Sequence, residues 1–333
     1  MYFIIGYRRK NLLSTALLLT AGLFVSSCHD EISNPDTQAE IRVETDLWHI
    51  MPGSRAATVD NAADLQSCDL RIDAYYHGTG TKYLNGAKLH YDASTWKFWD
   101  GDAQLHYYWP IEGSVYNPAS DNITVSSLDF VGLCPYVVPG YITSTDYNGV
   151  SGSISFDCDL SSYMTSAAQS GVTEFLWAYT GDQTQATQDE AGGAIPLEFT
   201  HPFARVKFVI TDACGENVKI NSISIADLKT TATCTFDGST TTWGSYGGNA
   251  AMTLTQELEI GGTTETDPFL VIPNDYGAKT LTVNATWDDW SNVTMDVSTS
   301  VTFNWQAGYS YTYNLTLSKY ALKVDTAKFT EQW

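Results

Sequence analysis

The chain has 333 residues, of which 43% are hydrophobic, so it is long enough for two domains of ordinary size. Its formal net charge is −21, from 17 basic and 38 acidic residues, and a surface this acidic repels nucleic acid and anionic lipid. These values exclude DNA and RNA binding. Frequent Thr, Ser, Val, Ile and Tyr, without long helix-forming stretches, predict an all-β fold with few short helices.

Residues 1–28 have the features of a lipoprotein signal peptide. A basic segment at residues 8–10 precedes an apolar stretch at residues 12–25, which is shorter than a typical membrane-spanning helix. Ser26 and Ser27 then lead directly into Cys28, which is typical of a bacterial lipobox whose cysteine carries lipid and becomes the new N-terminus. Because two or more acyl chains anchor a protein stably, a lipidated Cys28 would hold the chain at a membrane. The alternative is a secretory signal followed by an unrelated cysteine.

A polar tether and one amphipathic strand are expected after the signal. Residues 29–40 are polar, and the next stretch, EIRVETDLWHI, alternates between apolar and polar residues. Ile41, Val43 and Leu47 fall on one face of it, which predicts a half-buried strand over residues 41–50.

The loop MPGSRAATVDNAA, residues 51–63, follows this strand. It carries Arg55, a long charged side chain among small residues. Proteolytic nicking concentrates in such loops, so the bond between Arg55 and Ala56 is a candidate cleavage site. The alternative is an ordinary solvated loop arginine. Residues 29–55 would then be the tether and a removable first strand.

Two β-rich domains are predicted beyond this loop. Strand patterns follow one another closely from about Cys68, and Asp100-Gly101-Asp102 is typical of a hairpin tip. Residues 159–170 favour a short helix. The polar stretch at residues 180–193 predicts a boundary, which gives domains at 56–190 and 191–333. Seven or eight short strands in the second domain, separated by Gly, Asn and Asp turns, indicate a β-sandwich.

Five cysteines remain besides Cys28, and none has a metal-binding spacing: Cys68, Cys134, Cys158, Cys214 and Cys234. An odd number cannot all pair internally. Bridges from Cys134 to Cys158 and from Cys214 to Cys234 would suit an exported protein, whereas buried free thiols are at least equally expected.

No catalytic constellation is evident. The six histidines lack zinc-type spacings, no nucleotide-binding or nucleophile motif occurs, and no cofactor or metal is implied. His201 is expected to be a structural histidine at the start of a strand. Exposed Trp287 and Trp290 could stack on glycans, although aromatic residues on sandwich strands are more often part of the core.

The motifs taken in order resemble a known family. The lipobox, the alternating strand and the SRA loop are followed by YYWP, LDFVGLCPY, PLEFTHPFARVKF, FLVIPN, WQAGYSYTYNLTL and a short tail ending in Trp. This order resembles the fimbrillin (FimA/Mfa-like) family of Bacteroidetes, the lipoprotein-derived subunits of type V pili. The resemblance covers essentially the whole mature chain.

The resemblance implies two tandem transthyretin-like β-sandwich domains and export to the outer membrane and the fimbrium. It also implies cleavage after Arg55 by a trypsin-like, arginine-specific protease, which releases the first strand. A strand from a neighbouring pilus subunit then fills the apolar groove, and the subunits polymerise to support adhesion. Carried over to this chain, the lipid site is Cys28 and the donor segment lies within residues 320–333.

Within the donor segment, Leu322, Val324 and Phe329 supply the apolar positions, with a break at DTAKF. This break leaves three positions in the fibre open: a stalk subunit, a tip or accessory subunit that receives a strand without donating one, and an anchor subunit that is never cut. The alternative function is a monomeric outer-membrane lipoprotein that binds host or bacterial glycans through exposed aromatics.

Overall fold

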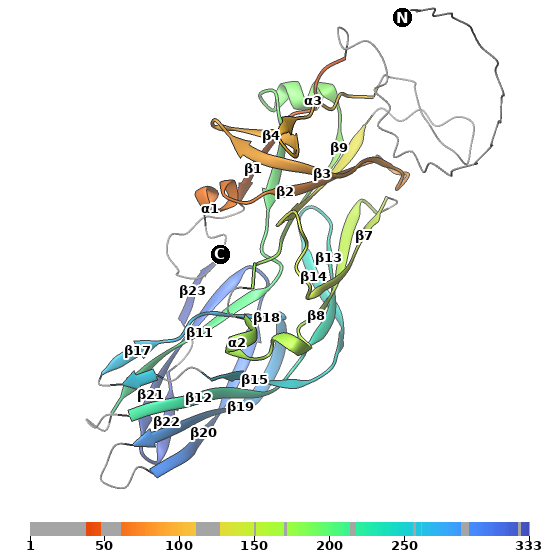
Figure 1. Cartoon of the computed structure of the whole chain (residues 1–333). Helices are drawn as coiled ribbons and strands as arrows, with labels where there is room; N and C mark the ends of the chain where they lie inside the picture. The colour runs from red at the N-terminus through yellow and green to blue at the C-terminus, as the bar shows by residue number, and fades with distance from the viewer. Residues whose placement is uncertain are drawn as a thin grey trace, which may run out of the picture. The chain divides into compact units, whose positions relative to one another are not determined.

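The computed structural model describes residues 38–47, 61–110, 127–149, 151–169, 172–213, 218–255, 258–260, 262–287, 293–325 and 328–332. Strands dominate, and the few helices are short: α1 (Ala62–Gln66), the 3-10 helix η1 (Ser161–Tyr163), α2 (Ser166–Gln169) and α3 (Gln185–Glu190) (Figure 1). The predicted all-β class with few short helices is confirmed. Within the described residues, no helix has both the length and the apolar character needed to span a membrane.

The first large sheet has the strand order β5-β4-β3-β2-β6-β9. Its strands are β2 (Leu70–Tyr76), β3 (Lys82–Asp92), β4 (Thr95–Asp100), β5 (Ala103–Gln104), β6 (Leu128–Cys134) and β9 (Leu176–Gln183). The expected hairpin tip joins β4 to β5, and Gly101 has a φ of +56° there, a conformation that favours glycine.

This sheet contributes to a hydrophobic core on each of its faces. Ile72, Phe130 and Ala178 belong to one core, which we call the upper core. Tyr75, Val131 and Trp177 point the other way, into a larger core. Because successive side chains of a strand point to opposite faces, both faces of β2, β6 and β9 are covered. This explains why every residue of β6, LDFVGLC, is buried and why all of them except Asp129 are nonpolar.

A second sheet joins strands that are far apart in the sequence, in the order β14-β13-β8-β7. Its members are β7 (Ile142–Asn148), β8 (Ser153–Asp159), β13 (Thr231–Phe236) and β14 (Thr241–Gly247) (Figure 1). The antiparallel pairing of β8 with β13 crosses the boundary predicted between residues 190 and 191, and the larger core also draws side chains from both sides of it. The polar stretch at 180–193 forms the end of β9 and helix α3.

Two further sheets complete the part around the larger core. The first contains β11 (Ala204–Asp212), β17 (Thr263–Glu265), β18 (Phe269–Val271), β21 (Tyr309–Ser318), β22 (Ala321–Val324) and β23 (Lys328–Gln332). The second contains β12 (Val218–Leu228), β15 (Ala250–Leu254), β16 (Leu258–Ile260), β19 (Asn274–Trp287) and β20 (Val293–Trp305). In β11, alternate apolar side chains such as Val206 and Phe208 are fully buried, as the alternating sequence predicts.

Candidate functional site

The first strand, β1 (Val43–Leu47), forms a two-stranded parallel sheet with β10 (Ile195–Phe199). Val43 lies opposite Ile195, and Leu47 lies opposite Phe199. This strand is shorter than the predicted range 41–50, of which residues 48–50 lie outside the described part. Its apolar face is buried as the alternation predicts, because Ile41, Val43 and Leu47 all belong to the upper core.

The segment containing β1, residues 38–47, is bonded on a second side as well. The backbone amide of Ile41 donates to the carbonyl of Tyr107 at 2.7 Å, and the amide of Trp109 donates to the carbonyl of Ala39 at 2.9 Å. On the other side, the amide of Ile195 donates to the carbonyl of Arg42 at 2.8 Å. We call residues 38–47 the inserted segment, because backbone groups of two separate stretches bracket it.

The side chain of a buried glutamine, Gln188, forms hydrogen bonds with backbone groups of the inserted segment. The Gln188 side chain on α3 is almost fully buried. Its Oε1 accepts from the amide of Arg42 at 3.0 Å and from Trp109 Nε1 at 3.3 Å. Its Nε2 donates to the carbonyl of Glu40 at 3.0 Å. Helix α3 is fixed in turn by a capping box, in which Thr184 and Thr187 bond reciprocally.

The partner strand β10 presents an apolar face of Ile195, Leu197 and Phe199, all fully buried. The ring of Phe199 lies against Gly132 of β6, where a Cβ atom would stand 2.7 Å from Phe199 Cζ. The close approach of ring and backbone therefore requires glycine at position 132. Without the inserted segment, β10 would expose unpaired backbone groups and part of this apolar face, the features of an edge that accepts another strand.

At the carboxyl end, the predicted donor segment divides into two strands. β22 pairs antiparallel with β21, and its Leu322 is buried in the larger core with the half-buried Val324 packed against that core. β23 also pairs with β21, between Tyr309 and Thr312, with a shift of register. Phe329 stands opposite Tyr311 in this pairing. Leu322 is therefore already committed to the chain's own core.

Several predicted site residues lie outside the described residues: Cys28, Arg55, Ala56, Trp290 and Cys214. The prediction that Trp287 is an exposed platform for glycans is wrong. Its indole is 0% exposed and belongs to the larger core, because it occupies an inward position at the end of β19. Trp287 thus has the core role that is more common for aromatic residues on sandwich strands.

The four described cysteines, Cys68, Cys134, Cys158 and Cys234, are free thiols, so the bridge considered between Cys134 and Cys158 is not formed. No local sequence pattern associates Cys68 with Cys134, but their side chains are hydrogen-bonded. That bond lowers the pKa of Cys68 to about 7. The same bond, together with burial, raises the pKa of Cys134.

His201 has the structural role that its sequence position indicates. It is buried, and its Nδ1 lies 2.8 Å from Glu174 Oε1, while Arg205 Nη2 donates to Glu174 Oε2 at 3.2 Å. Burial by itself would raise the pKa of Glu174, but charge interactions and hydrogen bonds with His201 and Arg205 hold it below its usual value. Across the described residues, no group of His, Cys, Asp and Glu is arranged to hold a metal ion.

Comparison with known proteins agrees with this architecture. The fimbrillin-like family model matches residues 71–333. A crystal structure of a fimbrial protein from Bacteroides vulgatus is 13% identical, with a TM-score of 0.58, and the match covers 88% of this chain and 99% of that one. A candidate cell adhesion protein from Bacteroides uniformis is 16% identical, with a TM-score of 0.53 and coverage of 88% and 99%. At these identities the likeness is one of fold. No curated protein matches the sequence.

Proposed function

Because the chain belongs to the fimbrillin-like family, we propose that it is a subunit of a bacterial surface fimbria that assembles by strand exchange. In this proposal a strand from a neighbouring subunit replaces the inserted segment. The family is one of structural and adhesion proteins rather than enzymes. It indicates assembly with other pilus subunits at the cell surface.

The observation that carries the proposal is the position of the inserted segment. It is the first described stretch of the chain, it lies between two other stretches, and it fills an apolar groove beside β10. A cut in the following loop, after Arg55, would separate it from all the strands that form its groove. The empty groove could then bind any extended strand that has apolar residues at alternate positions.

The energy of refilling the groove favours a durable joint. Three side chains, Ile41, Val43 and Leu47, leave the core when the segment departs, and each contributes about 1.5–3 kcal/mol on burial. Each backbone hydrogen bond that reforms adds about 1 kcal/mol net. A replacement strand regains both contributions without a covalent bond. Head-to-tail joints of this kind produce open filaments.

Export and processing complete the proposal. Cys28 would carry lipid and hold the precursor at the outer membrane, and an arginine-specific protease would cut between Arg55 and Ala56. In this proposal the donor strand is β23. Two observations support this choice: Leu322 of β22 is buried in the chain's own core, and β23 follows the break after Val324. β23 would leave its pairing with β21 when it is donated.

Brief trypsin treatment of the purified chain tests the proposal. We expect a cut after Arg55 and slow growth of polymers, detected by size-exclusion chromatography with light scattering. Arg55→Ala should stay monomeric under the same treatment. Arg42→Ala is the matched control, because Arg42 has an exposed side chain on the inserted segment and its loss leaves the cleavage loop intact. Chains that are cut after Arg55 and remain monomeric would contradict the proposal.

A further inference from the structure

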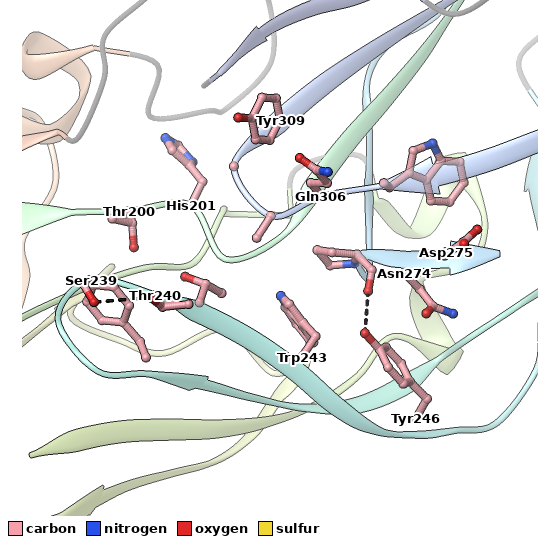
Figure 2. A pocket seen from close by; sticks show the side chains of 16 residues that line it. Thr200, His201, Ser239, Thr240, Trp243, Tyr246, Asn274, Asp275, Gln306 and Tyr309 are labelled. Carbon is pink, nitrogen blue, oxygen red and sulfur yellow. Dashed lines mark hydrogen bonds between the residues drawn. The ribbon is translucent and has the colours of Figure 1, made fainter. Parts of the chain in front are cut away.

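A cleft of about 530 Å³ opens next to the end of β10, where four loops meet (Figure 2). The loops follow β10, β13, β18 and β20, and they contribute Thr200, Thr240, Pro273 and Gln306 to the lining. Its volume lies in the range of small-ligand sites. None of the functions discussed above uses this cleft.

Hydrogen bonds between the loops hold the cleft in shape. Trp243 Nε1 donates to the carbonyl of Pro202 at 2.8 Å. The hydroxyl of Tyr246 donates to the carbonyl of Pro273 at 3.0 Å (Figure 2). The amide of Gly308 donates to the carbonyl of Phe203 at 2.9 Å. Because these bonds cross from one loop or strand to another, a ligand would meet a preorganised site and lose less free energy in ordering it.

Ring packing and hydrogen bonds fix the aromatic side chains that line the cleft. Trp243 packs against Phe156 and Phe203 on the core side, with ring centroids 5.5 and 5.2 Å apart, and it lines the cleft on its other side. The polar atoms of Trp243 and Tyr246 are occupied by the hydrogen bonds between loops. Tyr309 stands across the cleft from them and is half-buried (Figure 2). The ring faces carry negative charge density that attracts the polarised C–H groups of a sugar ring.

The polar lining is mostly neutral. Asn274 and Gln306 line the cleft, and within the described part of the chain their side-chain amides have no hydrogen-bond partner. An amide both donates and accepts, so it can satisfy two neighbouring hydroxyls of a sugar. Among the described residues that line the cleft, Asp275 alone carries a carboxylate, and the lining His201 directs its Nδ1 to Glu174. This combination favours a neutral, hydroxyl-rich ligand over an anion.

We propose that this cleft binds a neutral pyranose glycan, with Trp243 and Tyr309 in contact with the sugar ring and the amides of Asn274 and Gln306 bonded to its hydroxyls. The site differs from the glycan platform expected at Trp287, which is buried. Its lining residues include none of the inserted segment and none of β23, although Tyr309 pairs with Gln332 of β23.

The test uses the uncut full chain, so that polymer formation cannot raise its apparent affinity. The probes are polyacrylamide conjugates of glucose, galactose, mannose, fucose and N-acetylglucosamine, with a sialic acid conjugate and bare polyacrylamide for comparison. Binding is measured by surface plasmon resonance. We expect at least one neutral conjugate to bind, and Gln306→Ala and Tyr309→Ala each to weaken that binding at least tenfold.

Two matched variants serve as controls. Asn304→Ala removes an exposed amide two residues from Gln306, and Tyr320→Ala removes a tyrosine that is 81% exposed; neither residue lines the cleft. Both should bind within twofold of the parent chain. Gln306 has an exposed side chain, so its variant keeps the fold even if Tyr309→Ala does not. The proposal is overturned if no neutral conjugate binds, if sialic acid alone binds, or if Gln306→Ala binds within tenfold of the parent. None of these results bears on polymerisation of cut chains.

Discussion

The side-chain oxygen of Gln188 accepts a hydrogen bond from the backbone amide of Arg42 at 3.0 Å, across 146 residues of sequence. The same glutamine also bonds the carbonyl of Glu40, so one side chain holds two backbone groups of the inserted segment. Such a contact fixes the segment without using its side chains. A replacement strand could form the same bonds, because they involve only backbone atoms of the segment. We call these two hydrogen bonds the Gln188 latch.

Removing the Gln188 side chain should loosen the inserted segment. Gln188→Ala leaves buried backbone groups unbonded, which costs about 1–3 kcal/mol. We expect a lower free energy of unfolding in urea and faster hydrogen exchange at the Arg42 amide. Gln185→Ala, at an exposed position on the same helix, is the control and should change neither value. Unaltered exchange at Arg42 in the Gln188 variant would rule out the latch.

The buried face of the inserted segment should matter far more than its exposed face. Leu47→Ala removes a side chain that is 5% exposed in the upper core and should destabilise the chain by about 2–5 kcal/mol. Glu44→Ala changes an exposed residue of the same strand and should stay within about 0.5 kcal/mol. Equal effects in the two variants, measured by urea unfolding, would mean that β1 does not pack as described.

Gly132 should not tolerate a side chain. A methyl group there would stand 2.7 Å from the buried Phe199 ring, so Gly132→Ala should cost about 1–3 kcal/mol through overpacking. Gly244→Ala is the control, because nothing lies within 4 Å of a Cβ at that strand position. Combining Gly132→Ala with Phe199→Leu should recover part of the loss, and strictly additive costs would count against a direct clash.

One ion pair should make stability depend on pH near neutrality. Nδ1 of His77 lies 2.8 Å from Asp129 Oδ1, and this hydrogen bond raises the pKa of His77 above 6.5. The pair therefore stabilises the fold fully below pH 6.5, and this contribution is lost as the pH rises through the raised pKa. The imidazole is about half exposed, so the contribution stays below about 1 kcal/mol.

Urea unfolding of the parent chain and His77→Gln at pH 5.5 and pH 8.5 measures this effect. The stability difference between the two proteins should be larger at pH 5.5. A difference that is the same at both pH values, or larger at pH 8.5, would contradict the assigned role.

The sequence predicted what depends on local pattern. Alternation identified the buried face of β1 through Ile41, Val43 and Leu47, and the Asp-Gly-Asp signal identified the turn between β4 and β5. The position of His201 at the start of a strand also indicates its structural role, which its buried contact with Glu174 fulfils. In each of these cases, residues adjacent in the sequence are enough to predict the local structure.

What escaped prediction depends on contacts between distant residues. The pairing of β8 with β13 crosses the expected boundary, because strand partners are chosen by long-range packing and leave no mark in local composition. Gln188 lies in a polar stretch that resembled a linker, yet it is buried against the inserted segment. The alternation along β19 does not reveal whether Trp287 faces the core or the solvent, and the opposing sheets decide this.

The exchange of the inserted segment for a neighbour's β23 is tested most directly with a chain that ends at Asp325. This chain keeps β22, and with it Leu322 in the core, but it has no donor strand. After the cut at Arg55, full-length chains should polymerise, truncated chains should remain monomeric, and a mixture should give short oligomers capped by truncated copies. Light scattering after size-exclusion chromatography distinguishes these states. Truncated chains that polymerise as readily as full-length chains would contradict strand exchange through β23.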